Sequence, residues 1–463
     1  MQTVATPSIQ AAKAPALSPR DRSALRADLS RILAPYLSAG AGLCVIDSSG
    51  APAFSYNARA ALVPASTQKL IVASAALRYL GSAYRFHTQF ASSGPVGDGV
   101  IAGDLWLIGS GDPILVSNDL RGGIKILAAH GLERIHGGVV VDASALSGPE
   151  RNPLWDPTDS NYGFSAGTSG VSLDQDTIEF HIRSGAVGAP ATVSLEPPNP
   201  VVSFIGNIST VPRGYATQVT INPTGRENQF EVRGQIAAGA ARAVYYLPVM
   251  RIANYVGNVL ESLLEARSIQ TGRSSRTGIA PKGLTVLWDH RSPPLRFVVA
   301  KMLFESNNHI AEQLLRTVGR AVDGIGDDAR GVAVETAYLR SQNVPIENLH
   351  LVDGSGLSVS NRVAPLTLCT LLSRAELTPG GNQLYLALPR GGIEGTLHDY
   401  HFAQALGRVR AKSGHLSGVD ALAGYVRTHR HGRLAFAFLL DTAGNPWEAD
   451  AAIARAVDRL AEF

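Results

Sequence analysis

The residues with the clearest potential for chemistry are Ser66 and Lys69, which lie three positions apart in the stretch Pro-Ala-Ser-Thr-Gln-Lys. If Ser66 opens the helix expected to follow, Lys69 lies one turn later on the same face, with its amine within reach of the hydroxyl. A serine is a poor nucleophile until a neighbour removes its proton, and burial can lower the pKa of a lysine enough for it to do so. The helix N-terminus would add a backbone N–H where an oxyanion develops. Taken alone, the stretch also fits a helix cap followed by a solvated lysine.

A second candidate group is Lys412-Ser413-Gly414, which ends a strand-like run near the C-terminus. Here the lysine would supply fixed positive charge, the hydroxyl would donate to a carboxylate, and the glycine would let a substrate backbone lie alongside. The alternative is a lysine that only protects the edge of a sheet. The chain has six lysines, with one Lys-Ser/Thr-Gly and one Ser-x-x-Lys pattern among them, so such motifs have few chances to arise by accident.

A third group, Ser306-Asn307-Asn308, lies in a region of helical periodicity. Its Ser-x-Asn pattern is not specific, because residues 55–57 and 341–343 match it too. The first of these falls in a predicted hairpin strand and the second at a predicted helix end before a proline. Context therefore favours Ser306.

Composition and missing motifs exclude several other classes of protein. A net charge of +3 over 463 residues gives no footprint for nucleic acid. The sequence has no nucleophile elbow, phosphate-binding loop or His-Glu-x-x-His helix, and its histidines do not cluster at ligand spacing apart from two short-range pairs, so no metal or cofactor is expected. Cys44 and Cys369 are too few for a disulfide framework or a four-ligand zinc site, and whether they pair stays open.

The elements that must position these residues group at the two ends of the chain. With 463 residues, 45% of them hydrophobic, the chain is long enough for two or three domains. Helices and strands near the start return only after a long interval, which favours one domain split by an insertion. The predicted helices lie near 18–36, 64–80, 295–318, 331–342, 366–377 and 447–462, and the predicted strands near 42–47, 53–56, 408–412, 420–428 and 433–442.

The intervening region has a different character. Its short apolar runs, punctuated by Gly, Pro, Asn and Asp, predict mainly β modules with one helix near 249–266. The predicted division is a flexible leader over 1–17, a first domain of 18–88 and 283–463, a second of 89–170 and 245–282, and a third of 171–244.

The order of the three motifs, Ser-x-x-Lys, Ser-x-Asn and Lys-Ser-Gly, resembles the signature of the penicillin-recognising serine enzymes. A further segment is Asp-Gly-Ser-Gly-Leu-Ser at residues 353–358, followed by Asn361-Arg362. This segment resembles one of the D-alanyl-D-alanine carboxypeptidase/endopeptidase family, which comprises the class C low-molecular-mass penicillin-binding proteins of peptidase family S13. Residues 106–113 and 391–397 are similar to two further segments of that family. The resemblance implies an α/β (α+β) transpeptidase-like domain of the β-lactamase/DD-peptidase fold, split by a long, mainly β insertion that forms one or two additional domains.

The resemblance also implies roles for the residues of the Ser-x-x-Lys and Ser-x-Asn motifs. Ser66 would be the acylated nucleophile and Lys69 its general base. Ser306 would relay a proton to the amine of the leaving D-alanine, and Asn308 would hold the amide of the donor peptide.

The Lys-Ser-Gly segment would receive the C-terminus of the substrate. Lys412 and Ser413 would bind the terminal carboxylate beside Gly414, and the backbone N–H groups of Ser66 and His415 would form the oxyanion hole. The family commonly has Lys-Thr-Gly-Thr here, so Ser413 keeps the hydroxyl. His415 is bulkier and titratable and could alter the pocket or its pH profile, with a steric or packing role as the alternative.

Two acidic residues have competing interpretations. Asp353 directly precedes the turn-forming residues Gly354 and Gly356, which favours a structural role in which its carboxylate binds backbone amides. Residues 155–166 resemble a family segment whose acid lines the pocket for the peptide stem. Asp159 is therefore a candidate for binding the free amine of a diaminopimelate-like residue. The alternative is that Asp159 is a surface acid in a turn.

As a whole, the resemblance implies a serine D-alanyl-D-alanine carboxypeptidase that hydrolyses peptidoglycan stem peptides ending in D-Ala-D-Ala and is acylated by β-lactam antibiotics. Endopeptidase activity and the oligomeric state stay open. The alternatives are a β-lactamase or esterase of the same fold and a non-catalytic cell-wall binding protein. The first residues show no basic patch followed by an apolar core, so export to the periplasm, cell envelope or exterior would require a leader already removed.

Overall fold

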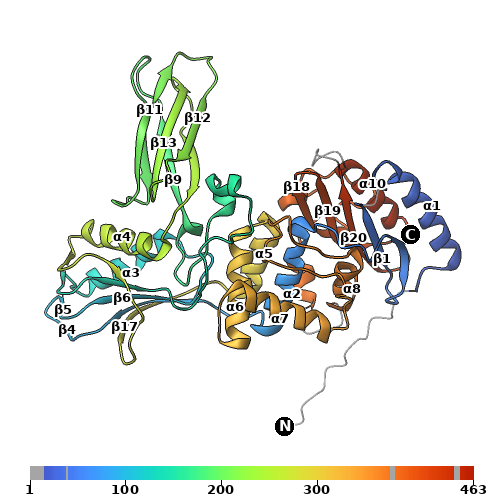
Figure 1. Cartoon of the computed structure of the whole chain (residues 1–463), viewed down its shortest axis with the longest axis horizontal. Helices are drawn as coiled ribbons and strands as arrows, with labels where there is room; N and C mark the ends of the chain where they lie inside the picture. Colours follow the sequence, from blue (N-terminus) through green and yellow to red (C-terminus); the bar gives the residue numbers. More distant parts are fainter. Residues whose placement is uncertain (1–14, 38–39, 376–380, 443–448) are drawn as a thin grey trace, which may run out of the picture.

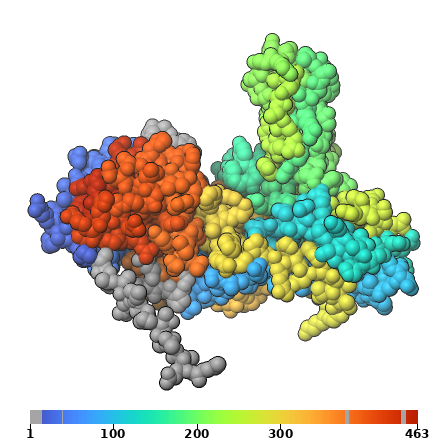
Figure 2. Space-filling model, turned by 180° about the vertical axis from the view of Figure 1, so that it is seen from behind, coloured from blue at the N-terminus to red at the C-terminus, as the bar shows by residue number. Residues whose placement is uncertain are grey.

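The computed structural model describes residues 15–37, 40–375, 381–442 and 449–463 and shows two lobes and a projecting arm (Figure 1). The lobe at the right of the view holds strands from both ends of the chain. The lobe at the left and the arm above it come from the middle of the chain. Seen from behind, the arm stands clear of the lobe that holds strands from both parts of the chain (Figure 2).

The first lobe is built on a five-stranded antiparallel sheet that joins the two ends of the chain. Its order is β18–β19–β20–β1–β2, so the N-terminal hairpin extends a three-stranded meander from the C-terminal region. The strands β19 and β20 are buried on both faces, which explains their near-continuous apolar runs. The strand bounds are β1 Gly42–Ile46, β2 Pro52–Tyr56, β18 Val409–Leu416, β19 Val419–Arg427 and β20 Arg433–Asp441.

Helices cover both faces of this sheet. On one face, α1 (Pro19–Ile32) and α10 (Asp450–Ala461) share an apolar cluster with the strands. A second cluster on the other face takes in α2, which is buried from Lys69 to Leu77 and is thereby fixed in the core. The helices of this second cluster are α2 (Lys69–Tyr79), α5 (Leu295–Glu305), α6 (Asn308–Asp323), α7 (Asp328–Ser341), α8 (Pro365–Ala375) and α9 (Gly381–Ala387).

The continuous helix predicted over 295–318 is wrong, because the chain breaks it at Ser306. That residue has the left-handed backbone conformation, with φ +58°, and ends α5. Asn307 then caps α6, its side-chain oxygen accepting from the backbone N–H of Ile310 at 3.0 Å. The break places Ser306 between two helices rather than within one.

The second lobe contains two sheets and two helices from the insertion. The larger sheet has the order β16–β8–β6–β3–β17 and the smaller β15–β7–β5–β4. The elements are β3 His87–Ser92, β4 Val96–Gly97, β5 Val100–Ile101, β6 Leu105–Gly109, α3 Ser117–Ala129, β7 Arg134–Ile135, β8 Val139–Asp142, α4 Ile252–Glu265, β15 Gln270–Thr271, β16 Arg276–Thr277 and β17 Thr285–Arg291.

The boundary predicted at residue 282 differs from the structure. Strand β17 pairs antiparallel with β3 from Thr285 opposite Ser92 to Arg291 opposite His87. The sheet of the insertion therefore continues to Arg291, and the first lobe resumes with α5. A strand belongs to the sheet with which it pairs, and that pairing spans about two hundred residues of sequence.

The arm consists of two three-stranded sheets. Their orders are β10–β9–β14 and β11–β13–β12, with β11 and β13 pairing in parallel. The bounds are β9 Thr177–Arg183, β10 Thr192–Glu196, β11 Ser203–Val211, β12 Gln218–Pro223, β13 Gln229–Ala237 and β14 Ala243–Pro248. The arm therefore has the mainly β structure that the short apolar runs of this region predict.

Two further points concern the described residues only. No helix in this part of the chain combines the length and apolar character needed to cross a lipid bilayer. Cys44 on β1 and Cys369 on α8 are buried free thiols.

Candidate active site

A cleft of about 800 Å³ lies where the two lobes meet. Its walls include Ser66, Ser306 and Asn308 from the first lobe and a segment around Asp159 from the insertion, with His415 at the end of β18. Lys69, Lys412 and Ser413 lie beneath this surface and are buried. The fold thus brings the three separated motifs to one place.

Ser66 and Lys69 meet as their spacing predicts. Ser66 lies in a short 3₁₀ helix, η2 (Ala65–Gln68), which leads directly into α2. Lys69 Nζ is 2.9 Å from Ser66 Oγ, 2.7 Å from Asn308 Oδ1 and 2.7 Å from the carbonyl oxygen of Ser355. Three oxygen atoms therefore surround the amine.

The electrostatic setting of Lys69 makes the neutral amine accessible near neutral pH. The side chain is fully buried, and this burial lowers the pKa of Lys69 to about 7, although the nearby carboxylates of Asp353 and Glu312 act in the opposite direction. A neutral amine has two N–H groups and one lone pair. If the two N–H groups donate to Asn308 and Ser355, the lone pair faces the hydroxyl of Ser66.

Strand β18 lies directly against the turn that carries Ser66. A Cβ added to Gly414 would lie 2.8 Å from the backbone nitrogen of Ser66, closer than real side chains approach. Glycine is therefore required for this approach, which sets the backbone of β18 beside the backbone N–H of Ser66.

The remaining part of the Lys-Ser-Gly motif is buried. Lys412 Nζ donates to the carbonyl oxygen of Ser413 at 2.6 Å, and Ser413 Oγ is 2.9 Å from Thr396 Oγ1. Burial, together with the positive charge of Lys69, lowers the pKa of Lys412 well below its usual value. An incoming carboxylate would reverse this penalty by supplying the opposite charge.

Asp353 has the structural role that its neighbouring glycines predicted. The fully buried carboxylate accepts from the backbone N–H groups of Gly356 (2.9 Å) and Ser358 (2.7 Å). It also accepts from Asn361 Nδ2 and Trp155 Nε1, each at 2.9 Å. Asp353 therefore holds the loop over residues 353–361 and ties it to the insertion.

Helix α6 fastens the insertion to the first lobe along one face. Asn308 Nδ2 donates to the carbonyl oxygen of Phe164 at 3.0 Å, and Gln313 Nε2 donates to that of Ser169 at 2.9 Å. Further along, Arg316 Nη2 donates to the carbonyl oxygen of Pro149 at 2.7 Å. The wall of the cleft that the insertion contributes is thus positioned by the helix that begins at Asn308.

Asp159 lies in a second 3₁₀ helix, η3 (Pro157–Asn161), whose first turn is capped by Asp156. Both acids line the cleft, and the described residues of its walls include no lysine or arginine. Partial burial and the charge of Asp156 raise the pKa of Asp159, while Arg151 opposes this change. This end of the cleft therefore presents negative charge.

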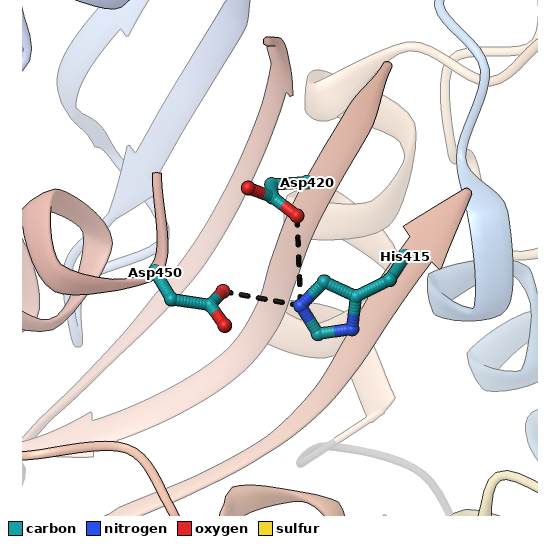
Figure 3. A group of neighbouring side chains, drawn as sticks. All are labelled: His415, Asp420 and Asp450. Atoms are coloured by element: carbon teal, nitrogen blue, oxygen red, sulfur yellow. Dashed lines mark hydrogen bonds and ion pairs between the residues drawn. The ribbon is translucent and has the colours of Figure 1, made fainter. Parts of the chain in front are cut away.

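The side chain of His415 is held by two carboxylates from different elements (Figure 3). Its Nε2 lies 3.1 Å from Asp450 Oδ1 and 3.6 Å from Asp420 Oδ1, and Tyr400 donates to the same Asp450 oxygen at 2.6 Å. These donor atoms lie within 4.8 Å of one another, as metal ligands can. Pairing of the imidazole with the two carboxylates accounts for the arrangement without an ion, and it keeps His415 against β19 and α10 at the edge of the cleft.

Sequence reasoning missed two residues of the site. Glu312 lies on α6 one turn after Asn308 and binds backbone amides near Lys69; its only signal was this helical spacing. Thr396, whose hydroxyl meets that of Ser413, belongs to the segment 391–397 that resembled the family, but no role was assigned to it.

Comparison with known proteins gives a consistent result. The family model described as D-Ala-D-Ala carboxypeptidase 3 (S13) matches residues 25–462. The D-alanyl-D-alanine carboxypeptidase of Actinomadura sp. (strain R39) is 32% identical over 459 residues, which cover 95% of this chain and 85% of that protein.

Solved structures of penicillin binding protein 4 from Haemophilus influenzae share the fold. One superposes with a TM-score of 0.79 at 24% identity, and a second, complexed with a β-lactam, with a TM-score of 0.75 at 23% identity. Each comparison covers 94% of this chain and 98% of the other. The fold class predicted from the motifs is confirmed. The chain belongs to the D-Ala-D-Ala carboxypeptidase 3 (S13) family of peptidases.

Proposed function

We propose that this D-Ala-D-Ala carboxypeptidase hydrolyses peptidoglycan stem peptides through an acyl-enzyme on Ser66. The observation that carries the proposal is the buried Lys69 amine, 2.9 Å from Ser66 Oγ, with a pKa lowered to about 7. A neutral amine at this distance can take the hydroxyl proton as Ser66 attacks.

The acylation step uses the groups around the cleft. Ser66 Oγ attacks the carbonyl carbon of the penultimate D-alanine, and its proton passes to Lys69. The developing oxyanion is received by the backbone N–H groups of Ser66 and His415, whose proximity is supported by the close contact at Gly414. The protonated Lys69 then returns this proton to Ser306, while the Ser306 hydroxyl, which opens onto the cleft, gives its own proton to the leaving nitrogen. The C–N bond breaks, terminal D-alanine departs with a neutral amine, and Lys69 is neutral again for the next step.

Deacylation completes the cycle. Water attacks the ester on Ser66, its proton passes to the lysine amine, and the serine oxygen is reprotonated as the shortened peptide leaves. The same serine would attack the strained amide of a β-lactam, because such a molecule mimics the acyl-D-Ala-D-Ala end.

Two further groups hold the substrate. Lys412 and Ser413, with Thr396 beside them, would bind the terminal carboxylate of the peptide, since the described residues give the buried lysine amine a carbonyl partner and no carboxylate. Asn308 joins Lys69 to the carbonyl oxygen of Phe164, so its amide lies where the donor peptide must pass.

The acidic end of the cleft would select a cationic side chain in the stem peptide. Asp159→Asn is expected to lower kcat/KM about tenfold for a peptide with a free amine on its third residue, because one partly buried charge is lost. Kinetics on the same peptide with its amine acetylated provide the control, and wild type and variant should then be equal. A variant that loses activity equally on both peptides would assign Asp159 to structure instead.

Product analysis by mass spectrometry tests the proposal as a whole. A defined pentapeptide ending in D-Ala-D-Ala should lose one D-alanine, and a cross-linked dimer should separate if the cleft also accepts an endopeptidase substrate. Binding of either peptide without cleavage would indicate a non-catalytic protein. Rapid turnover of a β-lactam without lasting acylation would indicate a β-lactamase instead.

The location of the substrate determines where the protein works. Peptidoglycan lies outside the cytoplasmic membrane, and membership of a cell-wall peptidase family supports a place in the envelope. We therefore place the mature enzyme in the periplasm or cell envelope. Fractionation of cells with an antibody against the folded protein would check this location.

A further inference from the structure

A buried carboxylate, Glu312, lies behind the lysine amine in the described part of the site. We propose that Glu312 is a positioning residue for acylation: it fixes the peptide group of Ser355, whose carbonyl receives an N–H of Lys69, and so aims the lone pair of Lys69 at Ser66. The inference rests on the proposed function, because it requires Lys69 to act as the base.

The contacts form a continuous chain from Glu312 to Ser66. The carboxylate accepts from the backbone N–H of Gly354 through both oxygens, at 3.1 and 3.0 Å, and from that of Ser355 at 2.7 Å. The carbonyl oxygen of Ser355 then accepts from Lys69 Nζ at 2.7 Å, and the same amine lies 2.9 Å from Ser66 Oγ. Moving the carboxylate would therefore move the carbonyl that orients the amine.

The orientation of the amine decides whether it can act as a base. Asn308 fixes one N–H of the neutral amine, and Ser355 fixes the other. If the Ser355 carbonyl turned away, the amine would be free to rotate and to donate to Ser66 rather than accept from it. Glu312 thus acts on the reaction through Ser355 without touching the substrate.

Burial couples the charge of Glu312 to that of Lys69. Glu312 is 2% exposed, and burial raises its pKa to about 8, whereas burial lowers the pKa of Lys69 to about 7. Two interacting groups with such close values titrate together rather than separately. In its ionised form, Glu312 stabilises the ammonium that forms when Lys69 takes the proton from Ser66.

Charged and titratable groups face this pair from each neighbouring element. The group facing Lys69 from β18 is Lys412, and the groups facing Glu312 are Asp353 from the loop after α7, Asp328 and Glu335 from α7, and Arg316 on α6, which pairs with Asp328.

Glu335 offers a matched control. It is a second carboxyl group buried in the same region, 1% exposed, and its oxygens have no hydrogen-bond partner among the described residues. Burial raises the pKa of Glu335 well above its usual value. Replacing Glu335 with glutamine therefore changes a buried carboxyl group that, among the described residues, holds no backbone amide of the loop over residues 353–361.

The test compares Glu312→Gln with Glu335→Gln in the second-order rate constant for acylation by a fluorescent penicillin, measured from about pH 5 to about pH 9. Glutamine has one acceptor oxygen, so it cannot accept from all the backbone N–H groups that Glu312 binds. Its NH₂ group would instead face a backbone N–H, and two donors cannot form a hydrogen bond. The Glu312 variant should acylate about 10- to 100-fold more slowly. The inflection of its pH profile on the acidic side should move to lower pH, since ionised Glu312 raises the pKa of Lys69 and glutamine cannot ionise. The Glu335 variant should match wild type in both quantities.

Equal rates and equal pH profiles for folded Glu312→Gln and wild type would overturn the inference, and so would equal losses in both variants. If wild type itself failed to acylate, the proposed function would fail instead. Should the glutamine variant not fold, Glu312→Asp retains the charge but shortens the side chain, and it should lower the rate without shifting the acidic limb.

A spectroscopic measurement on the unmodified chain gives independent support. With ¹³C-labelled lysine, the six lysines yield few signals, and the one lost in Lys69→Arg identifies Lys69. Coupling to Glu312 requires this signal to titrate in two steps. A single step unaffected by substitution at Glu312 would contradict the coupling.

Discussion

Ser66→Ala is expected to abolish covalent labelling by fluorescent penicillin and to lower peptide hydrolysis at least about 10⁴-fold. The change removes the oxygen that would carry the acyl group, and among the described residues Lys69 Nζ makes no hydrogen bond to another hydroxyl. Removal of this oxygen should leave the fold intact, because alanine fits a residue that opens onto the cleft.

The matched control is Ser74→Ala on α2, the helix that follows the turn carrying Ser66. Ser74 is buried, and its hydroxyl donates to the carbonyl oxygen of Leu70 at 2.7 Å, away from the cleft. Labelling followed by gel fluorescence, with a thermal melt for each protein, should show a wild-type signal for this variant. A labelled band of equal intensity in Ser66→Ala would contradict the proposal that the acyl-enzyme forms on Ser66.

The spacing of Ser66 and Lys69 was sufficient to predict their contact, although the turn differs from the one expected. In an α-helix and in a 3₁₀ helix alike, residue i+3 lies over residue i, so the change to η2 leaves the two side chains adjacent. Short motifs thus identify side chains whose contact is local in the chain. The Lys-Ser-Gly motif was recognisable for a similar reason, since its strand fixes where consecutive residues point.

Contacts between distant parts of the chain could not be predicted in this way. Glu312 binds amides more than forty residues away, and nothing in its helix indicates that those amides will lie there. The left-handed conformation of Ser306 is equally hidden, because serine does not require it. The boundary at residue 282 failed because β17 alone does not show that it will pair with β3.

Lys69→Arg is the second substitution expected to have a large effect, lowering the acylation rate at least about 10³-fold. Arginine keeps the positive charge but stays protonated at every relevant pH, so it has no lone pair to accept the proton of Ser66. Its longer, planar head must also enter a fully buried position made for an amine that contacts three oxygens. Lys301→Arg is the matched control, because Lys301 is partly exposed and pairs with Glu305 at 2.5 Å.

The pH dependence separates loss of a base from loss of packing. In wild type the acylation rate should rise as pH increases through about 7, because Lys69 must lose its proton before it can accept another from Ser66. Any residual rate in Lys69→Arg should show no inflection there, whereas a variant that only packs badly would keep the inflection at a lower amplitude. Stopped-flow acylation across this range, on protein whose melting curve is intact, distinguishes the two. A wild-type profile with no change near pH 7, or a Lys69→Arg rate within tenfold of wild type, would remove Lys69 from the role of base.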